Sequence, residues 1–229
     1  MVRKGEEITL TSGDGADILC YHAKADGTRP NGTKGGLVLI MEIFGVTAHI
    51  KDLCDDYAAR GYDVLSPQLY DRQVKDFQAS YGQEDVKKSL ELRAATPYET
   101  TVLDVQMCID KLREDGCTKV FITGYCYGGT VSWVAACRAD GLDAASCYYG
   151  GAIKQFNDEM PKCPTICHFG EKDHGIPMED VKMIEAAHPE VKVYVYDADH
   201  GFNSDRRNNY DKTAAERALE RTLALFDGA

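Results

Sequence analysis

The sequence predicts an α/β protein built on one mostly parallel β-sheet, with an antiparallel edge at its N-terminal end and helices on both faces. Three observations support this prediction. Two short alternating segments joined by a glycine-rich turn open the chain, apolar runs of strand length then alternate with segments of helical period, and 44% of the 229 residues are hydrophobic. This size and composition suit one large core, so we expect a single domain over residues 1–229.

The first elements form the expected antiparallel edge. Residues 8–21 are typical of two strands joined by the turn at Gly13-Asp14-Gly15. The continuous apolar run that follows is typical of a strand buried on both faces. The elements expected next are a strand over 36–41, a helix over 47–60 that Gly61 ends, and a strand over 62–67.

The rest of the chain repeats strand and helix. Residues 98–114 place apolar side chains near the helical period, which predicts a long amphipathic helix. Because parallel strands need right-handed crossovers, helices should cover both faces, and ligands should bind at the carboxyl ends of the strands. The polar loop 68–80 is a candidate wall of such a pocket. The further elements expected are strands over 119–123, 144–149, 164–169 and 191–196, and helices over 130–136, 178–187 and 212–226.

Charge and composition exclude several classes of function. The chain has 26 basic and 37 acidic side chains, a formal charge of -11 and a pI near 5.0, so neither nucleic acid nor an anionic membrane is an expected partner. The N-terminal residues contain no apolar signal core, and no run approaches the roughly 20 apolar residues of a membrane span. We therefore expect a cytoplasmic protein.

The nine cysteines are expected to be reduced. Most lie inside apolar runs, where thiols behave as small hydrophobic side chains, and a disulfide scaffold is not expected. Cys163, Cys167 and His168 are spaced like metal ligands, but strand periodicity would divide them between two faces. No metal ion and no organic cofactor is expected.

The segment Gly124-Tyr-Cys126-Tyr-Gly128-Gly129 stands between a predicted strand and a predicted helix. A turn of the form Gly-x-nucleophile-x-Gly requires small neighbours, since its strained backbone leaves no room for larger ones. A cysteine at this helix N-terminus would face free N–H groups and the positive end of the helix dipole, which favour a thiolate. The plainer interpretation is a buried cysteine in a glycine-rich turn.

Two further residues follow strand ends at the same predicted edge. Asp173 lies just after the strand over 164–169, and His200 lies in the loop after the strand over 191–196. The chain order of nucleophile, acid and histidine is that of α/β-hydrolases. His200 by itself would be interpreted as a surface-loop histidine, but three groups in this order at three strand ends favour a catalytic interpretation.

Five motifs in order make the chain resemble the dienelactone hydrolase family, over residues 8–226. They are Glu42-Ile-Phe-Gly45, Gly-Tyr-Cys126-Tyr-Gly-Gly, Tyr148-Tyr149-Gly-Gly, Gly170-Glu-Lys-Asp173 with Ile176-Pro177, and His200-Gly-Phe202. The resemblance implies an α/β-hydrolase fold with little or no lid, no cofactor, and a role in the degradation of aromatic compounds. It leaves open whether the protein is a monomer or a homodimer.

The resemblance also assigns roles to individual residues. Cys126 is the expected nucleophile, His200 its base and later the acid for the leaving group, and Asp173 the carboxylate that orients the imidazole. The backbone N–H groups of Ile43 and Tyr127 correspond to the family's oxyanion hole.

Glu42 corresponds to a family glutamate that holds the resting thiol and swings away when substrate binds. The thiolate then forms only on demand, which also protects it from oxidation. A carboxylate after a buried strand can equally belong to a salt bridge or an exposed loop, and both interpretations stay open.

The implied substrate is a lactone or an activated enol ester. Attack by the thiolate would give an acyl-thioester, which water activated by His200 would hydrolyse. A lactone with an enol leaving group is the expected case, because an enolate needs little protonation as it leaves.

The residues that would bind the substrate are less well defined. Family members bind a substrate carboxylate with two arginines, and the later of these positions, four residues after the histidine, is Ser204 here. The residue directly after the histidine is Gly201, where those members have a serine. The earlier position also lacks an arginine. The candidate substrate contacts are Arg206, Arg72, Tyr148 and Phe202, with Arg207, Arg93, Lys87 and Lys88 as further cations. Each of these cations could equally be a solvated surface charge, and Tyr148 could equally be a packing residue.

Three alternative functions remain. A cysteine amidotransferase or peptidase also uses a Gly-x-Cys-x-Gly elbow, but it usually orients its histidine with an acid downstream of it. A peroxide-sensitive thiol at Cys126 would leave Asp173 and His200 unexplained. A non-catalytic homologue that binds a ligand or a partner would be expected to lack one of the three groups.

Overall fold

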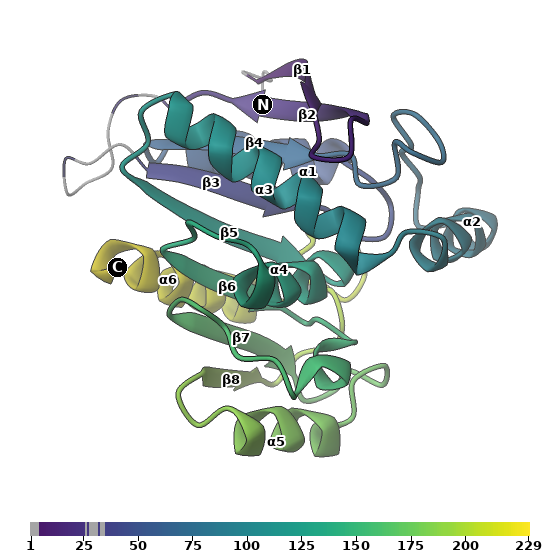
Figure 1. Cartoon of the computed structure of the whole chain (residues 1–229). Helices are drawn as coiled ribbons and strands as arrows, with labels where there is room; N and C mark the ends of the chain where they lie inside the picture. Colours follow the sequence, from purple (N-terminus) through teal and green to yellow (C-terminus); the bar gives the residue numbers. More distant parts are fainter. Residues whose placement is uncertain (1–4, 26, 28–31, 33–34) are drawn as a thin grey trace.

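A computed structural model describes residues 5–25, 27, 32 and 35–229 of the chain. Its centre is an eight-stranded sheet in the order β1-β2-β4-β3-β5-β6-β7-β8 (Figure 1). The strands are β1 (Glu6–Thr11), β2 (Asp17–Ala23), β3 (Gly35–Ile40), β4 (Tyr62–Pro67), β5 (Lys119–Tyr125), β6 (Ala144–Tyr148), β7 (Thr165–Gly170) and β8 (Lys192–Tyr196).

The antiparallel character is confined to the N-terminal edge of the sheet. β1 pairs antiparallel with β2, and β2 pairs antiparallel with β4, whereas every pair from β4 to β8 is parallel. The predicted mixed sheet is therefore confirmed. Because the parallel strands run in one direction, the residues that follow them meet at one edge of the sheet.

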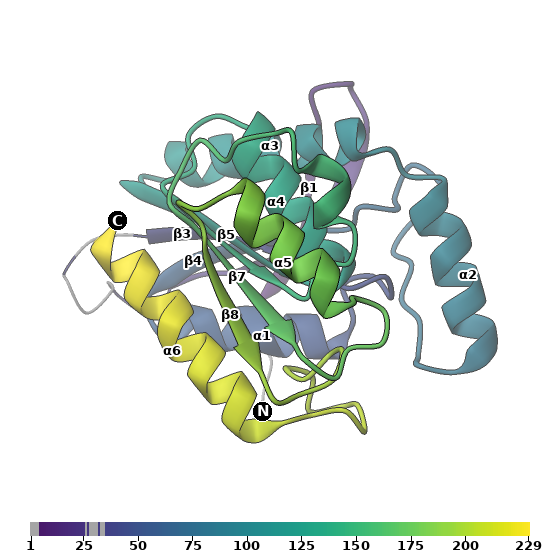
Figure 2. The ribbon, with the colours of Figure 1, turned by 90° about the horizontal axis from the view of Figure 1, so that it is seen from below.

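Helices cover both faces of the sheet, as Figure 2 shows in a view along the layers. α1 and α6 lie on one face, while α3, α4 and α5 lie on the other, and α2 lies apart from both layers at the side where the parallel strands end. The helices are α1 (Ala48–Ala58), α2 (Gln83–Ala94), α3 (Tyr98–Glu114), α4 (Tyr127–Arg138), α5 (Met178–Ala187), α6 (Lys212–Gly228) and the short 3-10 helix η1 (Ile153–Phe156).

The burial of the central strands explains why the sequence predicted them. β3 and β4 are buried along their whole length, and β5 is buried except at its first residue, as continuous apolar strands in a parallel sheet should be. The predicted bounds of β4, α3 and α5 agree with the structure. α4 begins at Tyr127, three residues before the predicted start, so Cys126 becomes its N-cap residue. η1 was not predicted.

The polar loop 68–80 is held against the end of β3. Gln68 accepts a hydrogen bond at Oε1 from the Val46 backbone N–H (3.1 Å) and donates from Nε2 to Asp76 Oδ1 (2.9 Å). The Phe77 carbonyl comes so near Gly45 that a Cβ there would lie 1.8 Å from its oxygen. The loop is thus fixed to the backbone that follows β3.

The connections at the carboxyl edge differ in length, and the longest, from β4 to α3, carries α2. Within residues 35–229 the connections also carry η1 but contain no inserted domain. Among the described residues, no helix is both long enough and apolar enough to cross a membrane.

Candidate active site

Cys126 lies at a sharp turn between β5 and α4. Its backbone has φ 59° and ψ -116°, a conformation that non-glycine residues rarely adopt. The neighbouring glycines are sterically required: a Cβ on Gly124 would lie 2.3 Å from the Gly128 carbonyl oxygen, and one on Gly129 would lie 2.2 Å from the Tyr148 carbonyl oxygen. The turn therefore presents a half-buried thiol at the carboxyl edge.

Two backbone N–H groups near Cys126 are candidates to hold a negative charge. Tyr127 is the first residue of α4, so its N–H has no partner within the helix. Ile43 follows β3, and in the described part of the chain neither its N–H nor that of Tyr127 has a protein acceptor. Both N–H groups lie on segments adjoining Cys126 in the fold, because Gly128 packs against the carbonyl of Ile40.

Asp173 and His200 meet at the same edge. The His200 Nδ1 atom lies 2.6 Å from Asp173 Oδ2, and the aspartate side chain is only 1% exposed. The second oxygen of this carboxylate accepts the Gly175 N–H at 2.8 Å. The pair is thus fixed at both ends, and Nε2 is the imidazole nitrogen left to face a reacting group.

The loop that carries His200 is held by two residues that the sequence did not reveal. Asp199 Oδ1 accepts the His200 N–H at 2.6 Å, and Asn209 donates from Nδ2 to Asp199 Oδ2 (3.1 Å) and to the His200 carbonyl (3.2 Å). Gly201 has φ 77°, which favours glycine, and a Cβ on it would lie 2.5 Å from Arg207 Nη1. The glycine therefore makes room for Arg207.

The charge on His200 is controlled by its neighbours. Burial disfavours the imidazolium, but the hydrogen bonds and charges of Cys126 and Asp173 outweigh it and raise the pKa of His200 to about 10. At neutral pH the His200 ring is therefore protonated, and its positive charge favours an anionic group beside it. The arrangement can supply an ionised nucleophile and a proton donor together.

Glu42 is buried beside this site, with 1% of its side chain exposed. Its Oε2 atom accepts a hydrogen bond from the Tyr81 hydroxyl at 3.2 Å, and its Oε1 atom lies 3.6 Å from Arg207 Nη1. The Tyr81 hydroxyl is also 3.2 Å from the Ser204 hydroxyl. Glu42 therefore does not lie in an exposed loop but forms a salt bridge with Arg207, while its gating role stays a prediction.

Tyr149 faces the catalytic edge, although Tyr148 was the predicted contact. The Tyr149 ring centroid lies 5.1 Å from that of His200, on a backbone with φ 37°. Burial raises the pKa of Tyr149 well above its ordinary value, and the charges of Glu42 and Cys126 act in the same direction. Tyr149 is thus an aromatic neighbour of Cys126, although only Tyr148 of this pair was expected to contact substrate.

Tyr148 and Phe202 are packing residues in this structure, which corrects the expectation that they contact substrate. Both are fully buried, and the Tyr148 hydroxyl is bound to Thr222 of α6 at 2.8 Å. Phe202 packs against Tyr149 and Tyr196, with ring centroids 5.1 and 5.2 Å away. Neither side chain has surface left for a ligand.

Arg72 and Arg206 are also committed to protein partners. Arg72 forms paired hydrogen bonds with Asp104 and with Asp14, at 2.8 to 2.9 Å, and is therefore unsuited to hold a substrate carboxylate. Arg206 lies 2.6 Å from Asp52 on the surface of α1. The arginine that lies next to Glu42 is the adjacent Arg207.

Arg93 lies beside Tyr127, the residue that follows Cys126. Its guanidinium donates to the Tyr98 hydroxyl at 3.1 Å and lies 5.9 Å from the centre of the Tyr127 ring. The charge of Cys126 is among the influences on the Tyr98 hydroxyl. Among the described residues, no carboxylate pairs with Arg93.

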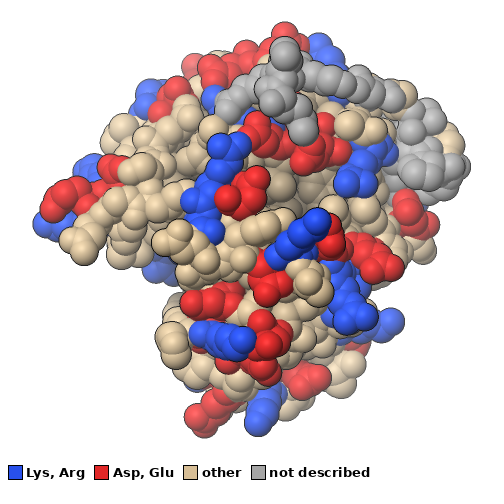
Figure 3. Space-filling view, turned by 180° about the vertical axis from the view of Figure 1, so that it is seen from behind, with Lys and Arg blue, Asp and Glu red and all other residues tan. Residues whose placement is uncertain are grey.

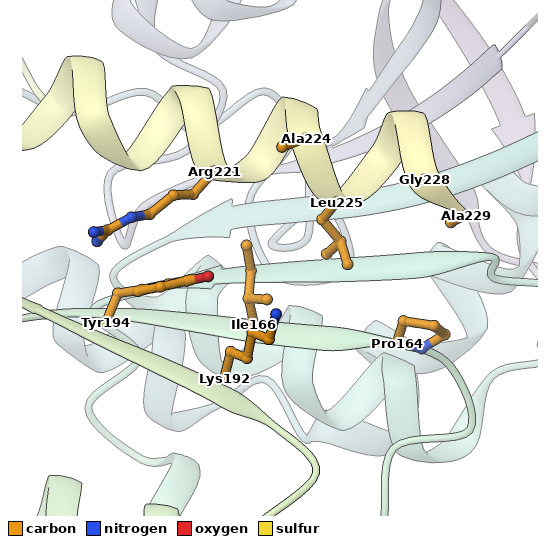
Figure 4. A pocket seen from close by; sticks show the side chains of 9 residues that line it. All are labelled: Pro164, Ile166, Lys192, Tyr194, Arg221, Ala224, Leu225, Gly228 and Ala229. Carbon is orange, nitrogen blue, oxygen red and sulfur yellow. The ribbon is translucent and has the colours of Figure 1, made fainter.

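Another hollow lies away from Cys126, Asp173 and His200. A cavity of about 330 Å³ lies between the C-terminal half of α6 and strands β7 and β8 (Figure 4). Pro164, which lines this cavity, precedes β7, whereas Asp173 follows β7, so the two lie at opposite ends of the strand.

In the described part of the chain, no three His, Cys, Asp or Glu side chains are grouped as metal ligands. On the face shown in Figure 3, acidic and basic side chains are interspersed.

An eight-stranded mixed sheet with Cys126, Asp173 and His200 at three strand ends defines an α/β-hydrolase. The class can be narrowed further, because the model of the dienelactone hydrolase family matches residues 21–229. The chain belongs to the dienelactone hydrolase family and is a carboxylic ester hydrolase.

The relatives agree with this assignment. A "Putative carboxymethylenebutenolidase" of Salmonella typhimurium is 30% identical, over 96% of this chain and 86% of its own, and the protein of that name from Yersinia pestis is 32% identical over 96% and 86%. The crystal structure of a "Putative Dienelactone Hydrolase" from Klebsiella pneumoniae is 28% identical, with a TM-score of 0.83 over 98% of both chains. An esterase from Pyrococcus furiosus, 13% identical with a TM-score of 0.66 over 97% and 90%, shares the fold.

Proposed function

We propose that this hydrolase cleaves a lactone or an activated enol ester through a Cys126-His200-Asp173 triad and an acyl-thioester intermediate. The observation that carries the proposal is the 2.6 Å contact of His200 Nδ1 with Asp173. In agreement with it, Cys126 and Asp173 raise the pKa of His200 to about 10 against the effect of burial. A histidine in such surroundings serves a thiolate both as counter-ion and as proton donor.

In the proposed acylation, Cys126 Sγ attacks the carbonyl carbon and forms the C–S bond, and the carbonyl electron pair moves to its oxygen. The Ile43 and Tyr127 N–H groups stabilise this oxyanion. The intermediate then collapses, the C–O bond to the leaving group breaks, and His200 Nε2 donates its proton to the departing oxygen. Because an enolate is a good leaving group, this proton transfer can follow cleavage of the C–O bond, and it leaves His200 neutral.

In the proposed deacylation, neutral His200 removes a proton from a water molecule, whose oxygen attacks the thioester carbon. The C–S bond breaks, the acid product leaves, and the thiolate and imidazolium are restored. Asp173 keeps the imidazole in the tautomer and orientation that both steps require.

Glu42 is proposed to control when the thiolate is exposed. Its carboxylate contacts Tyr81 and Arg207. The charges of Glu42 and Cys126 both raise the pKa of Tyr149, which lies near both groups. A buried carboxylate near the thiol disfavours the thiolate by like-charge repulsion. Movement of Glu42 during substrate binding would relieve this repulsion.

Arg93 is the side chain proposed to receive an acidic group of the substrate. It is half-buried beside Tyr98 and Tyr127, and no described carboxylate neutralises it. Replacing it by glutamine should raise KM for carboxylated lactones and leave turnover of p-nitrophenyl acetate within about threefold. Equal effects on both substrates would remove Arg93 from substrate recognition.

Single-turnover mass spectrometry of the intact protein tests the function. The panel is cis- and trans-dienelactone, an uncarboxylated enol-lactone and p-nitrophenyl acetate. The matched variants are Cys126→Ala and Cys163→Ala, because Cys163 is the other half-buried thiol. An acyl mass that forms in wild type and Cys163→Ala but not in Cys126→Ala supports the proposal. Lactone turnover that survives Cys126→Ala would contradict it.

A further inference from the structure

The hollow between α6 and strands β7 and β8 combines an apolar wall with two basic side chains (Figure 4). Leu225 of α6 and Ile166 of β7 point toward each other across it, and Pro164 lies at one end. The charged side chains in its lining are Arg221 of α6 and Lys192 of β8. Its volume of about 330 Å³ is that of a small ligand pocket, which suits a molecule with one ring or a short chain.

Within the described part of the chain, neither basic side chain has an acidic partner. The chain has 37 acidic and 26 basic side chains, so carboxylates are in excess, yet none of those described lies within ion-pair distance of Arg221 or Lys192. Arg221 is half-buried and Lys192 is exposed, so both are accessible from solvent. Ala229, the last residue, lies at the opposite end of the hollow from Arg221 (Figure 4). The positive charge in the hollow is therefore available to a ligand.

Arg221 is held in place by uncharged partners. Its Nη1 atom donates to the Tyr196 hydroxyl at 3.0 Å, and its guanidinium carbon lies 4.0 Å from the centre of the Tyr194 ring. The Tyr194 ring covers one face of the guanidinium and leaves the remaining N–H groups at its edge for another acceptor. A carboxylate can accept two such N–H groups in parallel hydrogen bonds.

The hydroxyl that holds Arg221 belongs to a buried chain of hydrogen bonds. The Tyr196 hydroxyl lies 2.8 Å from His168 Nδ1, and His168 Nε2 lies 3.2 Å from the hydroxyls of Ser146 and Thr222. Burial lowers the pKa of His168 to about 3, so its neutral ring can accept from Tyr196 while the Tyr196 oxygen accepts from Arg221. The orientation of Arg221 is thus fixed before a ligand arrives, which reduces the entropy cost of binding.

We propose that this hollow binds a small organic carboxylate with an apolar body, such as a one-ring aromatic acid. Its carboxylate would accept hydrogen bonds from Arg221, with Lys192 as a second cation. Its apolar body would lie between Ile166 and Leu225, a wall that offers nothing to a fully hydrated inorganic anion.

The proposed site is separate from the triad. Pro164 precedes β7 and Lys192 begins β8, whereas Asp173 and His200 follow these two strands. Binding in the hollow therefore does not depend on Cys126 being a nucleophile.

The test is an amide NMR titration of the intact protein with sodium benzoate, at constant ionic strength kept with sodium chloride. We expect saturable shifts of the amides in residues 192–194 and 221–225. Saturable shifts only near Cys126 and His200 would place benzoate in the active site and overturn the proposal. Shifts that are linear in benzoate, or spread evenly over the surface, would also overturn it.

Two analogues separate the charge of the ligand from its apolar body in the wild-type protein. Benzamide has nearly the shape of benzoate but no charge, and it should bind about tenfold more weakly, the loss expected for hydrogen bonds to a charged group. Acetate keeps the charge without the ring and should give no saturable shifts over the same concentrations. Equal affinity for benzoate and benzamide would contradict the role of the cations, and equal affinity for benzoate and acetate would contradict that of the apolar wall.

Variants test Arg221 directly. Arg221→Gln should weaken benzoate binding by about tenfold, because the paired hydrogen bonds to the carboxylate are lost. Arg217→Gln is the matched control, since Arg217 is an exposed arginine one turn earlier on α6 that does not line this hollow. Its screened charge should change the affinity by no more than about twofold. Equal affinity in the two variants would overturn the proposal, and the amide spectrum of each reports whether it is folded.

Discussion

His168 and His200 lie in opposite electrostatic surroundings, one inside the sheet and the other at its carboxyl edge. His168 is fully buried on β7, with Nδ1 2.8 Å from the Tyr196 hydroxyl and Nε2 3.2 Å from the hydroxyls of Ser146 and Thr222. Burial lowers its pKa to about 3, whereas Cys126 and Asp173 overcome burial and raise that of His200 to about 10.

The comparison teaches that burial alone does not make a reactive site. Hydroxyl neighbours satisfy His168 but give no reason for it to hold a proton, so it stays neutral. The cysteines show the same contrast: Cys147 faces Cys167 across β6 and β7, and burial raises the pKa of the Cys147 thiol. We therefore propose that reactivity arises where strand ends bring Asp173, His200 and Cys126 together.

The largest expected effect comes from removing the acid of this group. Asp173→Asn should lower kcat by about 10⁴, because the amide no longer fixes the required imidazole tautomer. The control is Asp180→Asn on α5, whose partner is the surface lysine Lys154. Steady-state hydrolysis of p-nitrophenyl acetate measures both. A loss of less than tenfold in Asp173→Asn would show that His200 works without it.

Thiol reactivity should differ between the edge and the interior. At pH 7, iodoacetamide should alkylate Cys126 about 100 times faster than Cys163, because only Cys126 adjoins an imidazolium and a helix N-terminus, while burial raises the pKa of Cys163 to about 11. Peptide mass spectrometry measures both rates in one sample. Similar rates would remove the distinction between the two thiols.

A smaller change should follow from Glu42→Gln. Without the carboxylate, like-charge repulsion of the thiolate is lost, and alkylation of Cys126 in the absence of substrate should rise by up to about tenfold. Glu159→Gln is a matched control, since Glu159 also pairs with an arginine, Arg138, but lies away from the site. An unchanged pH profile of alkylation in Glu42→Gln would exclude the gating role.

The smallest effect is expected at Tyr148. Tyr148→Phe removes the hydroxyl that meets Thr222 and should lower the free energy of unfolding by about 1 kcal/mol without changing kcat/KM. Urea unfolding and steady-state kinetics measure the two quantities. A clear loss of kcat/KM with unchanged stability would return Tyr148 to the substrate pocket.

The sequence was sufficient for the sheet and for the three strand-end residues. Buried parallel strands appear as apolar runs, so the bounds of β4 needed no structure, and chain order located Cys126, Asp173 and His200. Which of two adjacent residues faces the site was harder to predict. Adjacent residues point in different directions, so a family match did not reveal that Tyr149 rather than Tyr148 faces His200.

Loop side chains were beyond the sequence for a related reason. Arg207 rather than Arg206 meets Glu42, and Asn209 holds the His200 loop, because of backbone geometry that no periodic pattern records. Arg72 appeared available as a free cation in the sequence, yet it is bound to Asp104, a carboxylate 92 residues from its other partner, Ser12. Long-range pairing of this kind is set by the fold.

The most direct measurement is an NMR titration of the histidine side chains in the intact protein, with Cys126→Ala alongside wild type. In wild type, His200 should keep its proton until about pH 10 and His168 should remain neutral down to about pH 3. In Cys126→Ala, the pKa of His200 should fall by about 1 to 3 while that of His168 stays unchanged. If His200 instead titrates near 6.5 in both proteins, Cys126 and Asp173 do not stabilise the imidazolium and the proposed triad is wrong.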